Sequence, residues 1–216
     1  RATTLAQEGQ YTRALQALTS SGMAPQTRAT QEVMKKKHPT AAESGPSVPT
    51  TNQAQLSFTQ IDVEKAVKRF RRGSAPGPSG LRPEHLLVAV WAAPGRRDRA
   101  LQGLTRLVNV MVKGGIPESV APYFCGARLH AALKKDGGVR PIAVGYLLRR
   151  LVGKCCASEL KHRAATLFSP HQLGVGVRGG CETIVHTVRE AMEADPSLSL
   201  LQSDLVNAFN QADRDA

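Results

Sequence analysis

The sequence predicts an α+β fold, in which a helical N-terminal region precedes a β-hairpin and further helices. Three observations indicate this class. Apolar residues recur at helical spacing in most stretches between residues 11 and 113, one Asp-Gly-Gly turn joins two strand-like stretches, and no strand-helix-strand repeat follows. The 216 residues suffice for one or two domains, and a hydrophobic content of 41% is enough to fill a core.

An N-terminal helical segment is predicted over residues 1–38. Tyr11, Ala14, Leu15 and Leu18 recur at helical spacing, with a glycine on each side of the stretch. A second helix precedes Pro39, and its last turn holds three consecutive lysines that suit the helix dipole. Residues 39–55 are rich in Pro, Ser and Thr and are interpreted as a linker.

Residues 56–123 are predicted to be a second helical region. Thr59 and Asp62 have the spacing of a capping box at the start of its first helix. The apolar face of that helix is predicted to contain Ile61, Val63, Ala66, Val67 and Phe70, and Gly73 is predicted to close it. A Pro/Gly-rich turn leads to a helix near Pro83, and a longer helix covers about residues 97–113.

Residues 124–216 form the last predicted region. It begins with two strands around Asp136-Gly137-Gly138, a strong hairpin signal. The following amphipathic helix carries Leu147, Leu151, Val152, Cys155 and Leu160 on one side. A glycine-rich loop, a helix over residues 181–194 and a mostly buried strand over residues 197–209 complete the prediction.

The net charge of +12 favours a polyanionic partner such as nucleic acid or anionic lipid. Residues 124–180 hold ten Lys/Arg and two acids, whereas residues 181–216 hold two Lys/Arg and seven acids. This order suggests a phosphate-binding surface followed by a metal-binding one, although an ordinary charged surface remains the alternative. No run of about 18 apolar residues occurs, so no membrane span is expected.

The four cysteines do not have the spacing of a zinc site or of a C-x-x-C pair. Reduced, partly buried thiols are therefore expected, which fits an intracellular protein.

Cations cluster around the predicted hairpin turn. Lys134 and Lys135 precede the turn and Arg140 follows it, on strands about 5 Å apart. An anion such as a triphosphate would relieve their repulsion, because Arg offers a bidentate fork and Lys a point charge. The alternative is a solvated turn with ordinary surface lysines.

Asp204 is the sharpest candidate for catalysis. A carboxylate at the end of a buried strand is costly unless it is paired or binds a cation such as Mg²⁺. An N-cap or a salt-bridged aspartate is the alternative.

The loop that contains Gly174 and Arg178 would let backbone amides approach a phosphate, or would be a plain flexible loop.

Four stretches in this order resemble the reverse transcriptase domain of a non-LTR (LINE-like) retrotransposon. They read APGPSGLRPEHL, ALKKDGGVRPIAVG, SPHQLGVGVRGGCETIVH and LLQSDLVNAFN, and together they span about two-thirds of the chain. The resemblance implies the fingers and part of the palm of a right-hand polymerase. It also implies RNA-directed DNA synthesis with an RNA template, a DNA primer and deoxynucleoside triphosphates, acting in the nucleus and without a membrane.

The resemblance implies a role for each matching residue. Asp204 would be the first catalytic aspartate and a ligand of two Mg²⁺ ions, with the backbone carbonyl of Leu205 completing one shell, and Phe209 would be the steric gate against ribonucleotides. Lys134, Lys135 and Arg140 would contact the incoming triphosphate. The loop that faces the template or the nucleotide would contain Gln172, Gly174 and Arg178. Gly77 and Gly80 would form the entry turn, with a structural and template-side role.

The chain departs from the family pattern at several points. Asn210 stands where relatives usually carry Asp, and Val175-Gly176-Val177 stands where an aromatic is commoner. The family's Tyr/Phe-x-Asp-Asp motif is not found, so these residues alone are expected to have no polymerase activity, while a longer parent protein would. Two other interpretations stay open: a basic nucleic-acid-binding protein without chemistry, and a helical interaction protein that uses residues 1–38.

Overall fold

The structure is a computed structural model that describes residues 2–37 and 56–204. It contains helices and a two-stranded antiparallel sheet, so the predicted α+β class is confirmed. The chain divides into two compact units. Within the described residues, the first unit contains 2–37 and 128–144, and the second contains 56–127 and 145–204. The predicted linker over residues 39–55 lies outside the described residues.

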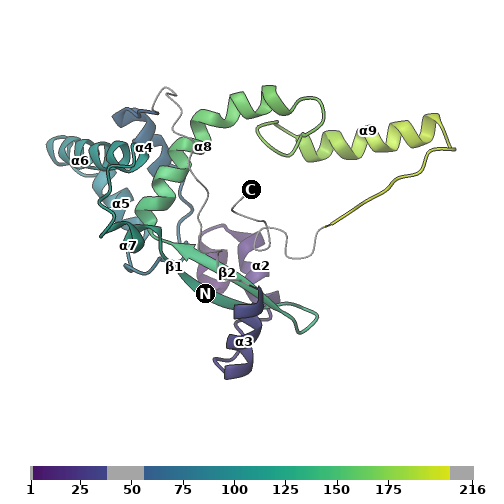
Figure 1. Cartoon of the computed structure of the whole chain (residues 1–216), viewed down its shortest axis with the longest axis horizontal. Helices are drawn as coiled ribbons and strands as arrows, with labels where there is room; N and C mark the ends of the chain where they lie inside the picture. The colour runs from purple at the N-terminus through teal and green to yellow at the C-terminus, as the bar shows by residue number, and fades with distance from the viewer. Residues whose placement is uncertain (1, 38–55, 205–216) are drawn as a thin grey trace. The chain divides into compact units, whose positions relative to one another are not determined.

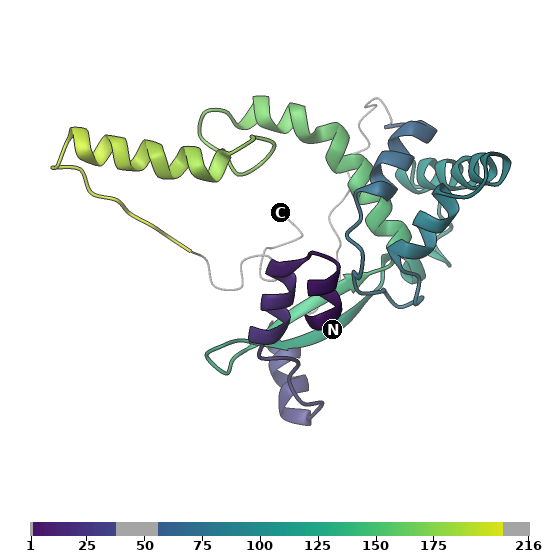
Figure 2. The same cartoon turned by 180° about the vertical axis from the view of Figure 1, so that it is seen from behind.

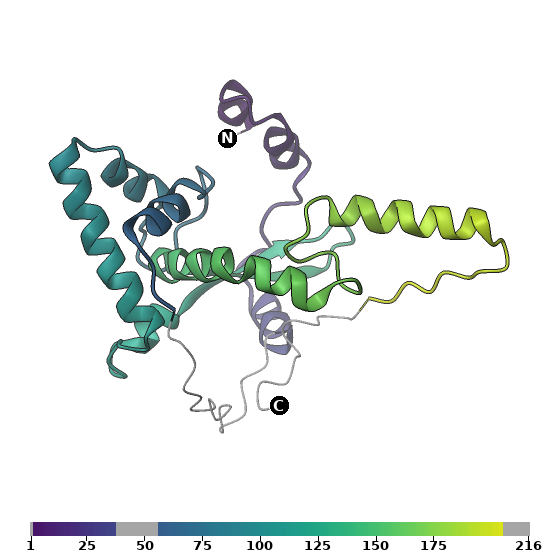
Figure 3. The same ribbon diagram turned by 90° about the horizontal axis from the view of Figure 1, so that it is seen from above.

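The first unit contains three short helices and the hairpin (Figure 1). The helices are α1 (Ala2–Gln7), α2 (Tyr11–Thr19) and α3 (Arg28–Lys37), and α1 packs against α2 (Figure 3). The strands are β1 (Ala127–Leu133) and β2 (Val139–Gly145). Helices α2 and α3 confirm the predicted N-terminal helices, whereas α1 was not predicted because its six residues show no amphipathic period.

The N-terminal segment pairs with the hairpin. Met23 forms an antiparallel bridge with Ala132, and the backbone N–H of Ala24 donates to the carbonyl of Ala131 at 2.9 Å. On the other side of the bridge, the N–H of Leu133 donates to the carbonyl of Gly22 at 3.0 Å. These bonds place β1 between β2 and the N-terminal segment, so the segment interpreted as separate belongs to the same compact unit as the hairpin.

The second unit is helical (Figure 2). Its helices are α4 (Gln60–Lys68), α5 (Pro83–Val90), α6 (Pro94–Val112), α7 (Ala121–Cys125), α8 (Leu147–Phe168) and α9 (Gly180–Ala194). Helices α4, α5, α6 and the first half of α8 pack together and form the core where they meet, whereas α9 extends away from them. Its buried members are Phe58, Val63, Ala66, Val67, Phe70, Leu86, Leu87, Val90, Leu101, Val108, Leu147, Leu151 and Cys155.

Local hydrogen bonds fix the entry to this bundle. The Asp62 carboxylate accepts from the backbone N–H of Thr59 at 2.9 Å, and the Thr59 hydroxyl accepts from the N–H of Asp62, which confirms the capping box. Hydrogen bonds from Thr59 lower the pKa of Asp62. The Asn109 side chain binds both backbone groups of Phe58, with distances of 2.8 and 2.9 Å. The start of α4 is thereby tied to α6.

The apolar faces predicted for α4 and α8 include residues that the core does not bury. Ile61 is 62% exposed and Leu160 is 43% exposed, so these two members of the predicted faces are not buried. The core ends near Cys155 on α8, and it draws no member from α9 among the described residues. Helix α4 ends at Lys68, five residues before Gly73, whose positive φ of 69° lies in the turn that follows.

The strand predicted over residues 197–209 does not form in its described part. Residues 199–204 adopt neither helix nor strand, and Leu200 and Leu201 are 61% and 91% exposed. A strand needs a partner to satisfy its backbone, and the described residues offer none to this stretch. The rest of the predicted strand lies outside the described residues.

Two further expectations concern helices and thiols. None of the helices between residues 2 and 204 that the structure describes is both long and apolar enough to cross a membrane. All four cysteines are free, and Cys155 is buried with Cys156 half-buried, as expected. Cys125 and Cys181 are exposed, so the expectation of burial was wrong for these two.

Candidate nucleic-acid interface

The hairpin turn is held by backbone hydrogen bonds. The N–H of Lys134 donates to the carbonyl of Gly138 at 2.8 Å, and the N–H of Gly137 donates back to the carbonyl of Lys134 at 3.2 Å. Gly137 has a φ of 79°, which a glycine adopts without strain. The Asp136 carboxylate accepts from the N–H of Gly138 at 2.9 Å. The predicted turn is therefore confirmed, and its one acid is engaged within it.

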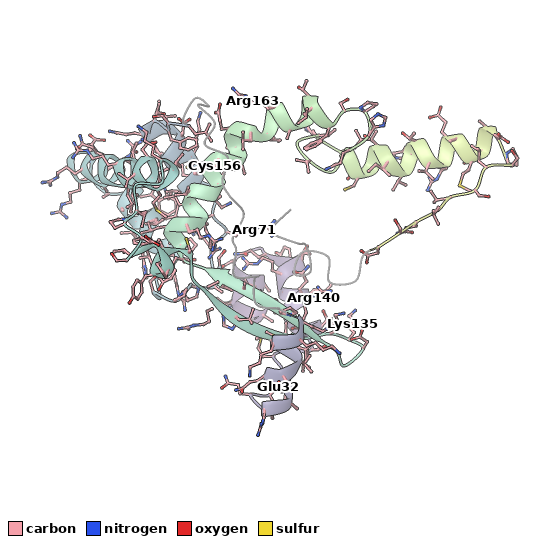
Figure 4. All side chains as sticks on the ribbon, viewed as in Figure 1. Glu32, Arg71, Lys135, Arg140, Cys156 and Arg163 are labelled. Carbon is pink, nitrogen blue, oxygen red and sulfur yellow. The ribbon has the colours of Figure 1, made fainter. Side chains whose placement is uncertain are left out.

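Three cations surround this turn, and two of them share a face of the sheet. Lys134 lies opposite Gly138, and side chains alternate along a strand, so Lys134 and Arg140 extend to the same side. Such diagonal neighbours lie roughly 7–8 Å apart. Lys135 and Arg140 are exposed at the turn end of the hairpin (Figure 4). Within the described residues, no ion pair involves any of the three.

Helix α3 brings further lysines to the hairpin. The Lys37 ammonium donates to the backbone carbonyl of Val139 at 2.6 Å, next to Arg140. Lys35 forms an exposed ion pair with Glu32 at 3.4 Å, which contributes little to stability. The contact of Lys37 was missed by sequence reasoning, because it joins residues 102 positions apart. The run of three lysines was its only signal.

The Pro/Gly-rich turn is packed tightly in the second unit. A Cβ added to Gly77 would lie 2.5 Å from the carbonyl oxygen of Gly145, so only glycine fits there. Gly80 has a φ of 74° and open space around it. The Arg150 guanidinium donates to the carbonyl of Ala75 at 2.9 Å. These contacts give Gly77 a structural role and leave the surface near Gly80 open.

The glycine-rich loop is ordered by its own side chain. The Gln172 amide oxygen accepts from the N–H groups of Gly174 and Val175, the latter at 3.1 Å. A Cβ added to Gly180 would lie 1.8 Å from the carbonyl oxygen of Leu173, so the loop closes on itself at this point. Arg178 is exposed. Gln172 thus fixes the loop, while Arg178 remains accessible to an anion.

Asp204 is exposed and lies at the end of the described residues. No group of three His, Cys, Asp or Glu side chains between residues 2 and 204 that the structure describes is close enough to hold a metal ion. Leu205, Phe209 and Asn210 lie outside the described residues. A single exposed carboxylate is a poor ligand set for Mg²⁺, which requires near-octahedral oxygen coordination. The metal role of Asp204 and Leu205 therefore stays a prediction.

A second group of cations, missed by sequence reasoning, surrounds Phe70 in the helical unit. The Arg150 guanidinium and the Lys154 ammonium lie 5.6 and 5.0 Å from the centroid of the Phe70 ring. The neighbouring Arg69 donates to the hydroxyl of Ser158 at 2.8 Å. Arg150, Lys154 and Ser158 are four residues apart on α8 and so share one face. The segment Lys68-Arg69-Phe70-Arg71-Arg72 was the available sequence signal.

Comparisons with known proteins found no relative of this chain. No protein-family model matches the chain, and no curated protein and no solved structure matches it either. The function of the chain is therefore inferred from its sequence motifs and from the described side chains.

Proposed function

We propose that this chain forms part of an RNA-directed DNA polymerase of the non-LTR retrotransposon kind. In this proposal its fingers bind template RNA and the incoming deoxynucleoside triphosphate. The observation that carries the proposal is the hairpin turn, where Lys134, Lys135 and Arg140 gather with one carboxylate, itself engaged by the backbone of the turn. The order of the four motifs supports the choice of family.

The chemistry of the turn favours a polyphosphate over a carboxylate ligand. Like charges this close repel, and their repulsion is relieved most by a ligand with several negative oxygens. Arg140 offers two parallel N–H donors, whereas Lys134 and Lys135 act as point charges that adapt to the ligand. Lys37, held beside Val139, adds positive potential near the same end of the hairpin. The hydrogen bonds of the turn fix the backbone from which these side chains extend.

The proposal gives the described residues a binding role. The hairpin binds phosphates, and the packed turn at Gly77 and the loop fixed by Gln172 position exposed groups such as Arg178. Mg²⁺ would be held through Asp204 and the carbonyl of Leu205, as the family implies. The proposal includes no step at the metal, because the described residues contain no group of three His, Cys, Asp or Glu side chains that could hold one. A DNA primer and a nuclear place of action belong to the same proposal.

A nucleic-acid-binding protein without chemistry is the alternative, because the hairpin observation supports it equally. The two functions are separated by RNA-templated primer extension with a complete protein that contains this chain. Asp204→Asn is expected to abolish extension while RNA affinity stays within about twofold of the unchanged protein. Loss of RNA binding together with extension would contradict the catalytic role of Asp204.

The steric-gate assignment has its own test in the same assay. Phe209→Ala is expected to increase the incorporation of ribonucleotides relative to deoxyribonucleotides. Unchanged sugar discrimination would contradict the assignment of Phe209.

An interaction role for residues 1–38 is best tested by substitution. Deletion of the segment would remove Met23 and Ala24, which pair with β1, and would therefore perturb the hairpin as well. Exposed side chains on α2 such as Leu15 and Leu18, 61% and 73% exposed, are better targets. If Leu15→Ser and Leu18→Ser leave RNA affinity unchanged, the nucleic-acid contact does not depend on this helix surface.

A further inference from the structure

We propose that Trp91 and the segment Arg69–Arg72 form a contact for single-stranded nucleic acid, in which an unpaired base stacks on the indole ring. The choice of nucleic acid as the partner rests on the proposed function. The contact itself lies in the helical unit and uses none of the hairpin residues. It is therefore a second, separate binding surface of the chain.

Trp91 is unusually exposed for a tryptophan next to a core. It caps the C-terminal end of α5, whose residues Leu86, Leu87 and Val90 are buried in the bundle. Trp91 itself is 57% exposed, although burial of its ring would remove a large apolar area from water. Aromatic residues make up only 4% of the chain, and Trp91 is its one tryptophan. The position of Trp91 outside the core therefore favours a binding role over a packing role.

Arg72 orients the tryptophan. The Arg72 guanidinium carbon lies 5.1 Å from the centroid of the Trp91 ring, within the range of a cation–π contact. The turn that carries Arg72 is fixed, because the N–H of Gly73 donates to the Glu84 carboxylate and the hydroxyl of Ser74 donates to the carbonyl of Arg71 at 2.6 Å. Arginine planes and aromatic rings are the surfaces on which unpaired bases stack.

Four further cations lie in the same segment or on α8. Arg69 and Arg71 are exposed in the same short segment, and Arg71 is labelled in Figure 4. Arg150 and Lys154 share one face of α8, and both lie over the ring of Phe70. Phe70 is only 5% exposed, so a base cannot reach its ring. Within the described residues, no ion pair involves these four cations.

The Glu84 carboxylate accepts from the backbone of the turn that carries Arg72. Burial raises the pKa of Glu84, but hydrogen bonds from the backbone N–H groups of Gly73 and of Glu84 itself outweigh it, and the pKa stays below its ordinary value. Glu84 is therefore ionised near neutral pH and is engaged by the backbone N–H of Gly73. A strand whose phosphates follow the cations can place a base on Trp91, whereas a duplex keeps its bases stacked.

The test uses the fluorescence of the one tryptophan as the signal for stacking. The full chain is titrated with a 12-nucleotide oligouridylate and with an abasic ribose-phosphate oligomer of the same length. Oligouridylate is expected to quench the fluorescence, and the abasic oligomer is expected to bind without quenching. Oligothymidylate in a parallel titration shows whether the contact distinguishes DNA from RNA.

Substitution gives the affinity. Trp91→Ala is expected to weaken oligouridylate binding by about 5- to 150-fold, the equivalent of about 1–3 kcal/mol per stacked base, and Trp91→Phe by less. Tyr123→Ala is the control, because Tyr123 is 68% exposed in the same unit but lies on α7, and no change in affinity is expected. Affinities for these variants come from anisotropy of labelled oligouridylate, with circular dichroism as the check of folding.

The outcomes separate this inference from the proposed function. If the unchanged chain binds neither oligomer, both proposals fail. If it binds both oligomers but Trp91→Ala keeps full affinity, or if the abasic oligomer quenches as strongly as oligouridylate, only the stacking contact is contradicted. Absence of quenching by oligouridylate despite tight binding would likewise contradict it and would favour a protein partner for this surface.

Discussion

Gly77→Ala is the sharpest test of how the Pro/Gly-rich turn is built. The added methyl group would meet backbone atoms and not a side chain that can move away. Its Cβ would lie 2.5 Å from the carbonyl oxygen and 2.8 Å from the carbonyl carbon of Gly145, and 2.9 Å from the Cα of Tyr146. Tyr146 caps the start of α8, which carries two core leucines, so neither side can yield freely.

The size of the effect follows from these distances. Heavy atoms in contact normally lie about 3.5–4.0 Å apart, so the turn and the start of α8 must separate by roughly 1 Å. Overpacking of this kind costs about 1–3 kcal/mol in free energy of unfolding. A matched glycine lies on α6, where a Cβ added to Gly103 would meet nothing within 4 Å. Gly103→Ala should stabilise the chain by about 0.5–1 kcal/mol, because alanine favours a helix.

Urea unfolding followed by circular dichroism compares the two variants. The midpoint should fall for Gly77→Ala and rise for Gly103→Ala, with similar slopes. RNA affinity of folded Gly77→Ala should stay near that of the unchanged chain if the residue acts only through packing. A midpoint for Gly77→Ala at or above that of Gly103→Ala would refute the reasoning.

Further predictions concern the capping box and the thiols. Thr59→Ala should lower the free energy of unfolding by about 0.5–2 kcal/mol in urea. Hydrogen bonds from Thr59 hold the pKa of Asp62 below its ordinary 3.8, so this stabilisation is present near neutral pH and is lost as the pH falls from about 4 through the lower folded value. The stability gap between the unchanged chain and Thr59→Ala should therefore narrow at acid pH, where the hydroxyl loses its bond to the carboxylate and keeps the one from the N–H of Asp62, and a constant gap would argue against the assignment. Burial raises the pKa of Cys155 to about 11, so iodoacetamide at about pH 8 should modify the exposed Cys125 and Cys181 first. Rapid labelling of Cys155, read by peptide mass spectrometry, would contradict its burial.

Local patterns explain the parts of the fold that the sequence predicts. The helices that were predicted show apolar periodicity over two or more turns, and the capping box and the Asp-Gly-Gly turn depend on residues at most four positions apart. These features need no partner from elsewhere in the chain. For the same reason α7, which has five residues, was missed, since one turn carries no period.

Long-range contacts explain the parts that sequence reasoning missed. A helical period identifies an apolar face but not how far the packed core extends along it, so the predicted faces include Ile61 and Leu160, which the core does not bury. A strand depends on its partner, and the partner of residues 199–204 cannot be read from their own composition. The contact of Lys37 with Val139 likewise joins segments far apart in the sequence.

In the candidate site, too, local features were predictable and long-range contacts were not. Clustering of Lys134, Lys135 and Arg140 follows from the hairpin period and was predictable. The contacts of the cations around Phe70 and of Arg72 with Trp91 join α8, the turn that follows α4 and the end of α5, so they required the structure.

The most direct test of the account is the salt dependence of RNA binding by the full chain and two triple variants. Each phosphate contact with a single strand contributes about 0.7 to the slope of log affinity against log salt. Replacing Lys134, Lys135 and Arg140 with alanine should reduce the slope by about 2. The control replaces three exposed arginines on α6, Arg96, Arg99 and Arg106, which removes the same charge at another place. The account predicts a near-unchanged slope for this control. Equal loss of slope in both variants would show that net charge, and not the hairpin, determines binding, and would contradict the central claim.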